Sequence, residues 1–193
     1  IGPIALDEFS PSALAAKIAA SPLARERGID PATARIRLAV ITNSTYDGLC
    51  YNAERIKQAL GDSVDVLHFD EAWLPHAAFH DFYGDYHAIG ADRPRCKESM
   101  IFSTQSTHKL LAGLSQASQI LVQDAENSHL DRDVFNEAYL MHTSTSPQYA
   151  IIASCDVAAA MMEEPGGTAL VEESIAEALD FRRAMRKVDE EWG

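Results

Sequence analysis

A lysine with hydroxyl and imidazole neighbours follows a short apolar run in the middle of the chain. The segment Gln105-Ser-Thr-His-Lys109 follows Ser99–Ser103, which is predicted to form a buried strand. Residues just past the carboxyl end of such a strand lie where α/β folds bind their ligands. A shielded lysine there can become a nucleophile that forms a Schiff base. Lys109 is therefore a candidate catalytic residue, and an ordinary surface lysine is the alternative that the same five residues allow.

A carboxylate follows a second predicted strand in the same way. Asp70 comes directly after the apolar run Val64–Phe69. A carboxylate buried there needs a hydrogen bond or an oppositely charged partner, because burying it alone is costly. One suitable partner is the protonated nitrogen of a pyridine ring, which makes that ring an electron sink. The alternative is that Asp70 only caps the next turn.

A run of hydroxyl side chains precedes a predicted helix in the last third of the chain. In His142-Thr-Ser-Thr-Ser-Pro147, four hydroxyls come before a helix expected over Pro147–Met162. Hydroxyls and free backbone N–H groups at a helix N-terminus can bind an anion such as a phosphate group. The alternative is an N-cap, since serine and threonine favour that position without any ligand.

Histidines and cysteines give weaker signals. His76, His80 and His87 lie among acidic residues, but the chain has no HExxH motif and no third ligand at a diagnostic spacing, so no metal site is predicted. Three cysteines at wide spacing do not form a disulfide framework, and Cys155 is expected in a helix core. A reducing cytoplasm is the expected compartment.

Composition limits the possible functions of the chain. With 193 residues, 47% hydrophobic and 23% charged, it is expected to form one sizeable globular domain. A net charge of −13 argues against nucleic acid as a partner, and suits either a cationic ligand or simple solubility. No signal peptide is recognised and no apolar stretch is long enough to span a bilayer. Because the chain starts at Ile1 without Met and stops within a helical pattern, it is expected to be a fragment.

The elements that would position these side chains alternate between strand and helix. Strands are predicted at Ile36–Thr42, Val64–Phe69, Ser99–Ser103 and Gln119–Gln123, with helices at 50–60 and Leu110–Ala117 and an irregular segment at 74–98. The first strand is apolar throughout rather than alternating, which indicates a parallel sheet covered on both faces. The alternation is typical of an α/β layer.

The last third of the chain is predicted to be helical and to pack against that layer. Helices are expected over Val134–His142, Pro147–Met162 and Thr168–Trp192, with a break at Pro165-Gly-Gly167. The final helix carries an apolar stripe at Val171, Ile175, Leu179, Met185, Val188 and Trp192.

Taken together, four blocks of sequence resemble one family. The chain is similar to the bacterial pyridoxal-phosphate-dependent basic amino acid decarboxylases, the lysine, arginine and ornithine decarboxylase family. The blocks keep the family's order along the chain, and SxHK and HxSTSP together are specific to it. They are Ala39–Ala53, His68–Trp73, Ser103–Leu111 continuing to Ser115–Ser118, and Phe135–Ser154.

The resemblance implies a type I fold like that of aspartate aminotransferase, an α/β large domain with a mostly parallel sheet and flanking helices. Residues 1–163 would be part of this pyridoxal 5'-phosphate (PLP)-binding domain, and residues 164–193 would be a helix leading out of it. Lys109 would hold the cofactor as a Schiff base, and Asp70 would pair with its pyridine nitrogen. Ala72 would pack on one face of the ring, with Trp73 beside it.

The resemblance also implies a site at a subunit interface. Ser106 and His108 would contact the phosphate region of the cofactor, and Ser144 would reach the phosphate of the partner subunit's cofactor. The protein would then be a homodimer, assembled further into larger rings. A small-residue phosphate loop and a ring-stacking histidine of the family lie upstream of the matching blocks and are absent here, so the fragment alone is expected to be inactive.

The implied reaction is decarboxylation of lysine, arginine or ornithine, with Lys109 or His108 returning a proton to the carbanion. Each turnover would consume one proton. The acidic chain suits any of the three cationic substrates. Two other functions remain open: a different reaction of the same cofactor, such as transamination, and a non-catalytic or regulatory role.

Overall fold

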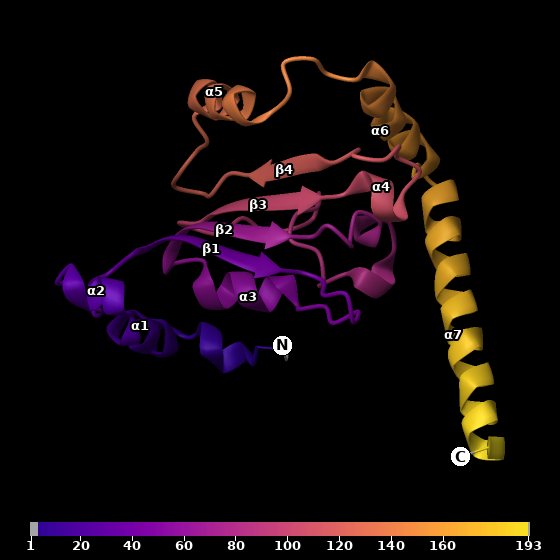
Figure 1. Cartoon of the computed structure of the whole chain (residues 1–193), viewed down its shortest axis with the longest axis horizontal. Coiled ribbons are helices and arrows are strands. Elements are labelled where there is room, and N and C mark those ends of the chain that lie inside the picture. The colour runs from indigo at the N-terminus through magenta and orange to yellow at the C-terminus, as the bar shows by residue number, and fades with distance from the viewer. Residues whose placement is uncertain (1–3, 193) are drawn as a thin grey trace.

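A four-stranded mixed sheet forms the centre of the molecule. The structure is a computed structural model and describes residues 4–192. The strands are β1 (Ile36–Thr42), β2 (Val64–Asp70), β3 (Met100–Gln105) and β4 (Gln119–Gln123), and they lie in the sheet in chain order (Figure 1). The first three are parallel and β4 is antiparallel to β3. We refer to the edge where β1, β2 and β3 end as the carboxyl edge.

Seven α-helices and three short 3₁₀ helices accompany the sheet in the described residues. Two of the α-helices are only a turn long and lie beside the sheet's ends, and the last is the longest. In order they are η1 (Leu6–Phe9), α1 (Pro11–Ala20), α2 (Pro22–Glu26), α3 (Ala53–Leu60), η2 (Ala77–Phe79), η3 (Asp81–Tyr83), α4 (Thr107–Leu110), α5 (Arg132–His142), α6 (Tyr149–Met161) and α7 (Gly166–Trp192).

Local sequence explains where several helices begin. The Ser10 hydroxyl accepts a hydrogen bond from the Ala13 N–H at 3.3 Å, and Pro11 occupies the first turn of α1. Asn52 caps α3 in the same way, through the Arg55 N–H at 2.9 Å. The helix predicted at 50–60 is confirmed, and the Asn52 cap places its start at Ala53.

The hydrophobic core lies between α3 and one face of the sheet. Ile56 and Leu60 of α3 are 1% exposed, and they belong to one buried cluster with Leu67, Phe69 and Ile101 of the sheet. Burying a side chain of this size contributes about 1.5–3 kcal/mol. This packing holds the carboxyl edge at a defined position.

The opposite face of the sheet is more open than the sequence predicted. Leu38 and Val40 of β1 are 53% and 56% exposed, so β1 is not covered on both faces. The elements in the described residues that approach this face include α5, whose Phe135 ring lies 6.1 Å from that of Phe102. The continuous apolar pattern predicted the parallel strands correctly, and the prediction of two covered faces was wrong for this part of the chain.

The predicted helix over Leu110–Ala117 was wrong. The helical turn α4 begins earlier, at Thr107, and the chain then folds back as an irregular loop, 111–118, so that the Ala117 C=O accepts from the His108 N–H at 3.1 Å. Gly113 disfavours a helix and permits a close approach: a Cβ there would lie 3.2 Å from the His108 nitrogen. The loop also reverses the chain, which is why β4 runs antiparallel to β3.

The helical last third is confirmed, and only part of it packs on the sheet layer. Val171 of α7 is 5% exposed, whereas Met185, Val188 and Trp192 are 50%, 49% and 84% exposed. Figure 1 shows α7 running away from the sheet toward the C-terminus. Gly166 and Gly167 lie inside α7, so the break between α6 and α7 falls just before them. Within residues 4–192, no helix is both long and apolar enough to cross a membrane.

Candidate active site at the carboxyl edge of the sheet

Lys109 lies on α4, just past the end of β3, and points toward an indole ring. Its Nζ is 4.5 Å from the centroid of the Trp73 ring, within the range of a cation–π interaction. Its backbone N–H donates to the Ser106 C=O at 3.0 Å, which closes the turn. Within residues 4–192 the ammonium group makes no salt bridge. The lysine is therefore half-buried and held by an aromatic face rather than by a carboxylate.

Trp73 forms one wall of a hollow beside this lysine. The Tyr46 ring meets Trp73 edge to face with centroids 5.4 Å apart, although Tyr46 itself is 89% exposed. The hollow has a volume of about 690 Å³, and Leu110, the neighbour of Lys109, also lines it. Its size and its mixed lining, with five aromatic residues among polar and aliphatic ones, suit a small organic ligand. Tyr46 is a site residue that sequence reasoning missed, although it lies within the first block of the family resemblance.

Asp70 ends β2 on the open face of the sheet, next to β3. It pairs in register with Thr104, and one carboxylate oxygen accepts from the Ala72 N–H at 3.3 Å. The capping role considered for Asp70 is thus present in the structure. The other carboxylate oxygen accepts no hydrogen bond from the described residues, so it is free to accept one from a ligand. Ala72 follows in the same turn and is half-buried.

His108 is fixed by the loop that folds back over α4. Its Nδ1 donates to the Ala117 C=O at 2.8 Å, and its backbone N–H donates to the same oxygen. Nε2 is therefore the nitrogen left to face a ligand. The neighbouring Thr107 hydroxyl is buried and finds no hydrogen-bond partner among the described residues. It is therefore an unsatisfied polar group in the turn that carries Lys109.

The two predicted phosphate contacts lie in different places. Ser106 precedes α4 and makes no side-chain capping bond, so its hydroxyl is available beside Lys109. Ser144 is exposed in the loop between α5 and α6, which Figure 1 shows well away from α4. The structure thus brings Lys109, Trp73, Ser106 and His108 to one edge of the sheet and leaves Ser144 outside.

The hydroxyl run does not cap the following helix. The residue before α6 is Gln148, which makes no side-chain capping bond, and the Ser144 hydroxyl instead accepts from the Ser146 N–H at 3.1 Å. The interpretation of this run as an N-cap was therefore wrong. The prediction that Ser144 serves a phosphate of the partner subunit stays a prediction.

The histidines considered for a metal site are used in other ways. His76 packs edge to face against Tyr83 with centroids 5.0 Å apart, and His80 accepts from the Phe82 N–H. His87 donates from Nδ1 to the Tyr83 C=O at 3.2 Å. In the part of the chain that the structure describes, no three histidine, cysteine or acidic side chains are grouped as metal ligands.

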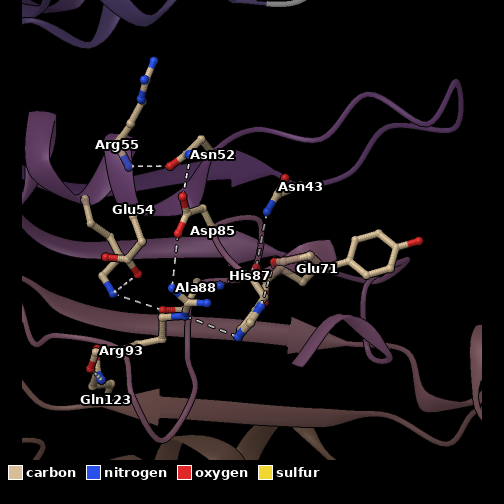
Figure 2. A network of polar contacts seen from close by, with 12 residues as sticks. Asn43, Asn52, Glu54, Arg55, Glu71, Asp85, His87, Ala88, Arg93 and Gln123 are labelled. Carbon is tan, nitrogen blue, oxygen red and sulfur yellow. Dashed lines mark hydrogen bonds and ion pairs between the residues drawn. The ribbon is translucent and has the colours of Figure 1, made fainter. Parts of the chain in front are cut away.

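A buried carboxylate beneath the site was missed. Glu71 directly follows Asp70 and is 0% exposed. It is a hydrogen-bond acceptor for groups from several segments, as Figure 2 shows for Asn43 and Ala88. Burial raises the pKa of the Glu71 carboxyl, and the hydrogen bonds it accepts offset part of that rise. A signal existed in the sequence: Asn43, Glu71 and Gln105 each stand at the carboxyl end of a predicted strand.

In the 84–93 loop, the backbone of Ala88 is hydrogen-bonded on both sides of its Cα. The Ala88 N–H donates to Glu71 Oε1 at 2.8 Å, and the Ala88 C=O accepts from Lys57 Nζ at 3.2 Å. Lys57 is 4% exposed and also pairs with Glu54 at 3.0 Å. The loop is thereby tied both to the carboxyl edge and to α3 (Figure 2).

These groups match what PLP requires. The lysine amine is not paired with an acid, one Asp70 oxygen is unused, and the Ser106 hydroxyl and His108 Nε2 are available at the same edge. An aldehyde, a pyridine nitrogen and a phosphate are the complementary groups. The residues present therefore fit this cofactor.

Comparison with known proteins finds amino acid decarboxylases similar to this chain. A family model described as "Orn/Lys/Arg decarboxylase, major domain" matches residues 1–193. The chain is 61% identical over 188 residues to the lysine decarboxylase LdcA of Pseudomonas aeruginosa, covering 97% of this chain and 24% of that protein. It is 44% identical to the biodegradative arginine decarboxylase of Escherichia coli, covering 100% of this chain and 25% of that protein.

Solved structures of lysine decarboxylases have a similar fold over nearly all of this chain. Lysine decarboxylase A from Pseudomonas aeruginosa superposes with a TM-score of 0.87 at 60% identity, over 97% of this chain and 24% of that one. The Francisella novicida lysine decarboxylase LdcF gives a TM-score of 0.85 at 42% identity, over 100% of this chain and 25% of that one. The chain spans about a quarter of the length of these relatives.

Proposed function

Because this chain belongs to the Orn/Lys/Arg decarboxylase family, we propose that it is part of a PLP-dependent enzyme that decarboxylates a basic amino acid. The observation that carries the proposal is the pairing of Lys109 with Trp73 beside Asp70, at the carboxyl edge of a mainly parallel sheet. The α/β layer is the corresponding part of a type I PLP fold in this proposal. Residues 1–163 belong to its large domain, and residues 164–193 lead out of it.

Lysine is the substrate we propose first. The sequence identity to a protein named lysine decarboxylase is 61%, against 44% for one named arginine decarboxylase. The net charge of −13 favours the approach of a cationic amino acid. Arginine and ornithine are the competing substrates to be tested beside it.

The residues of the site would act as follows. PLP supplies an aldehyde for the substrate amine and a ring that accepts the electrons left by departing CO₂. Lys109 Nζ would hold the cofactor, and Trp73 would shield that amine from water. The free Asp70 oxygen would accept a hydrogen bond from the pyridine nitrogen and keep the ring protonated, which favours spreading of negative charge. His108 Nε2 or Lys109 Nζ would give a proton to the reacting carbon, so that each turnover would take up one proton.

The proposal extends to the partner. The family resemblance implies that Ser144 serves the phosphate of a second copy's cofactor, and its exposure, in a loop that Figure 1 shows away from α4, supports that role. This arrangement makes the enzyme a homodimer with shared sites, from which larger assemblies are built.

The test is to locate the cofactor chemically. The full-length protein is loaded with PLP, its absorbance is recorded, and borohydride is added before peptide mapping. We expect a near-visible absorbance band that borohydride removes, and a reduced adduct on Lys109. Lys109→Ala should abolish the band and the adduct, whereas Lys97→Ala, which removes an exposed lysine, should change neither. An adduct elsewhere, or none, would contradict the proposal.

Product analysis separates the reactions. Release of CO₂ together with a diamine or agmatine supports decarboxylation, and the rates with lysine, arginine and ornithine rank the substrates. Formation of a keto acid in place of CO₂ would favour an aminotransferase.

A further inference from the structure

Glu71 is the buried acid nearest in the chain to the proposed cofactor ligand Asp70. Its backbone N–H donates to the Thr104 C=O at 2.9 Å, which extends the pairing of β2 with β3 by one residue. Asp70 and Glu71 therefore leave the strand as a rigid pair. The Asp70 side chain lies on the open face of the sheet, and the Glu71 side chain is enclosed.

The Glu71 carboxylate accepts two hydrogen bonds on each oxygen. A buried carboxylate needs such donors, because each unused acceptor would be costly. Oε1 accepts from Ala88 N at 2.8 Å and Asn43 Nδ2 at 3.3 Å, and Oε2 accepts from Ser103 Oγ at 2.6 Å and Gln105 Nε2 at 3.4 Å.

Three of these four donors come from β3 or from the end of β1, and the fourth, Ala88, comes from the 84–93 loop. Asn43 follows β1, Ser103 and Gln105 belong to β3, and the Gln105 side chain accepts from Gln119 Nε2 of β4 at 2.8 Å. Asn43 also links β1 to the segment before α3, because its side-chain oxygen accepts from the Tyr51 N–H at 2.9 Å. Glu71 thus links the segment that ends in Asp70 to the segment that leads into Lys109.

Glu71 is not placed to touch a ligand. It is fully enclosed, and it does not line the hollow beside Trp73 and Leu110. Any effect on chemistry must therefore pass through the residues that it holds.

We propose that Glu71 is a positioning residue, which sets the relative placement of Asp70 and Lys109 by joining the ends of β1, β2 and β3 through one carboxylate. The inference rests on the proposed function, since Asp70 and Lys109 are the cofactor ligands of that proposal. Displacements of about 1 Å in a reacting pair can lower a rate about 100-fold.

The main test is Glu71→Gln in the full-length enzyme. The amide has the same size but presents an N–H₂ group where the carboxylate accepts hydrogen bonds. We expect kcat to fall about 10- to 100-fold while KM for the amino acid stays within about twofold. The absorbance maximum and induced circular dichroism of the bound cofactor should shift, because the ring no longer sits at the same angle to Asp70.

Ser99→Ala is the matched control. The Ser99 hydroxyl is also fully buried in this sheet, but it donates to Gly61 O and Val64 O at the opposite edge, at 2.8 and 2.6 Å. We expect this variant to lower the unfolding temperature while leaving kcat and the cofactor spectrum unchanged. The proposal is overturned if Ser99→Ala lowers kcat as much as Glu71→Gln. It is also overturned if Glu71→Gln changes only the unfolding temperature.

A milder variant keeps the test available if Glu71→Gln does not fold. Ser103→Ala removes one donor and keeps the carboxylate, and a smaller change of the same kind in kcat and spectrum is expected. Unchanged kcat and spectrum in Ser103→Ala would then overturn the proposal. If the unmutated enzyme itself carries no adduct on Lys109, the failure lies with the proposed function instead.

Discussion

His87 is held in its neutral form by the groups around it. Its Nδ1–H donates to the Tyr83 C=O at 3.2 Å, and its Nε2 accepts from the Arg93 side chain at 3.4 Å. Burial lowers the pKa of His87, and the nearby positive charge of Arg93 lowers it further. The folded protein therefore binds this proton less readily than the unfolded chain. Stability from this source is complete above the ordinary histidine pKa of about 6.5 and is lost as the pH falls below it.

Urea unfolding at pH 7.5 and pH 5.5 tests whether His87 lowers the stability of the protein as the pH falls. We expect the free energy of unfolding to fall with pH less steeply in His87→Gln than in the parent protein. His142→Gln, which removes an exposed imidazole, serves as the control. An identical fall in the parent and in His87→Gln would show that His87 does not take part.

The residues of the site differ in how far the sequence could identify them. Asp70 stands directly after an apolar run and Lys109 lies six residues past another, so the position of each near a strand end could be predicted from the sequence. The contact between Lys109 and Trp73 required the fold, because 36 residues separate them. The position of Glu71 at a strand end was visible in the sequence, but its hydrogen bonds were not, since its donors come from residues 43, 88, 103 and 105 and meet only in the assembled sheet.

At the level of elements, the loop over 111–118 controls the turn that carries Lys109. It packs on α4 through Gly113, where a Cβ would lie 2.9 Å from the Ala117 Cβ and 3.2 Å from backbone atoms of residues 107 and 108. Backbone cannot move aside as a flexible side chain can. Gly113→Ala should therefore push the loop away from α4 and destabilise the fold by about 1–3 kcal/mol.

The unfolding midpoint and the yield of the borohydride adduct on Lys109 both report this change. We expect both to fall in Gly113→Ala, because the loop also holds His108 through the Ala117 C=O. Ser115→Ala, an exposed change in the same loop, should affect neither. A full adduct yield in Gly113→Ala would mean that the loop does not position the turn.

The strands were predicted better than the segment between β3 and β4. Apolar runs bounded by polar turns gave β1 from Ile36 to Thr42, and β4 from Gln119 to Gln123, with their observed bounds. The direction of β4 could not be predicted, because it depends on whether the 106–118 connection crosses over the sheet or reverses the chain. Apolar residues at helical spacing suggested a helix there, and Gly113 with the contact to His108 favoured a reversal.

At the scale of the whole molecule, apolar surface remains uncovered on one face of the sheet. Leu38, Val40 and Ile120 are 53%, 56% and 44% exposed. Exposed apolar patches of this kind promote association. We therefore expect the 193-residue chain, made alone, to bind a hydrophobic dye and to elute larger than a monomer.

Replacing Leu38 and Val40 together by threonine tests where that surface lies. Threonine keeps the strand preference while reducing the apolar area, so dye fluorescence should fall. Leu23→Thr with Ile29→Thr, at exposed positions outside the sheet, is the matched control. An equal fall in the control would show that the sheet face has no special part in association.

The two hydrogen bonds to the Ala88 backbone, from its N–H to Glu71 and to its C=O from Lys57, affect how this molecule moves. The residue lies in a segment without regular secondary structure, yet its N–H is enclosed by Glu71 and its C=O by Lys57. Solvent can reach that amide hydrogen only when its hydrogen bond to Glu71 opens and the buried residue is exposed, which we expect to require opening of the sheet edge. Its exchange with deuterium is thus governed by opening of the sheet layer rather than by local fraying of the loop. A single amide in an irregular segment thereby reports the integrity of the edge on which Asp70 and Lys109 depend.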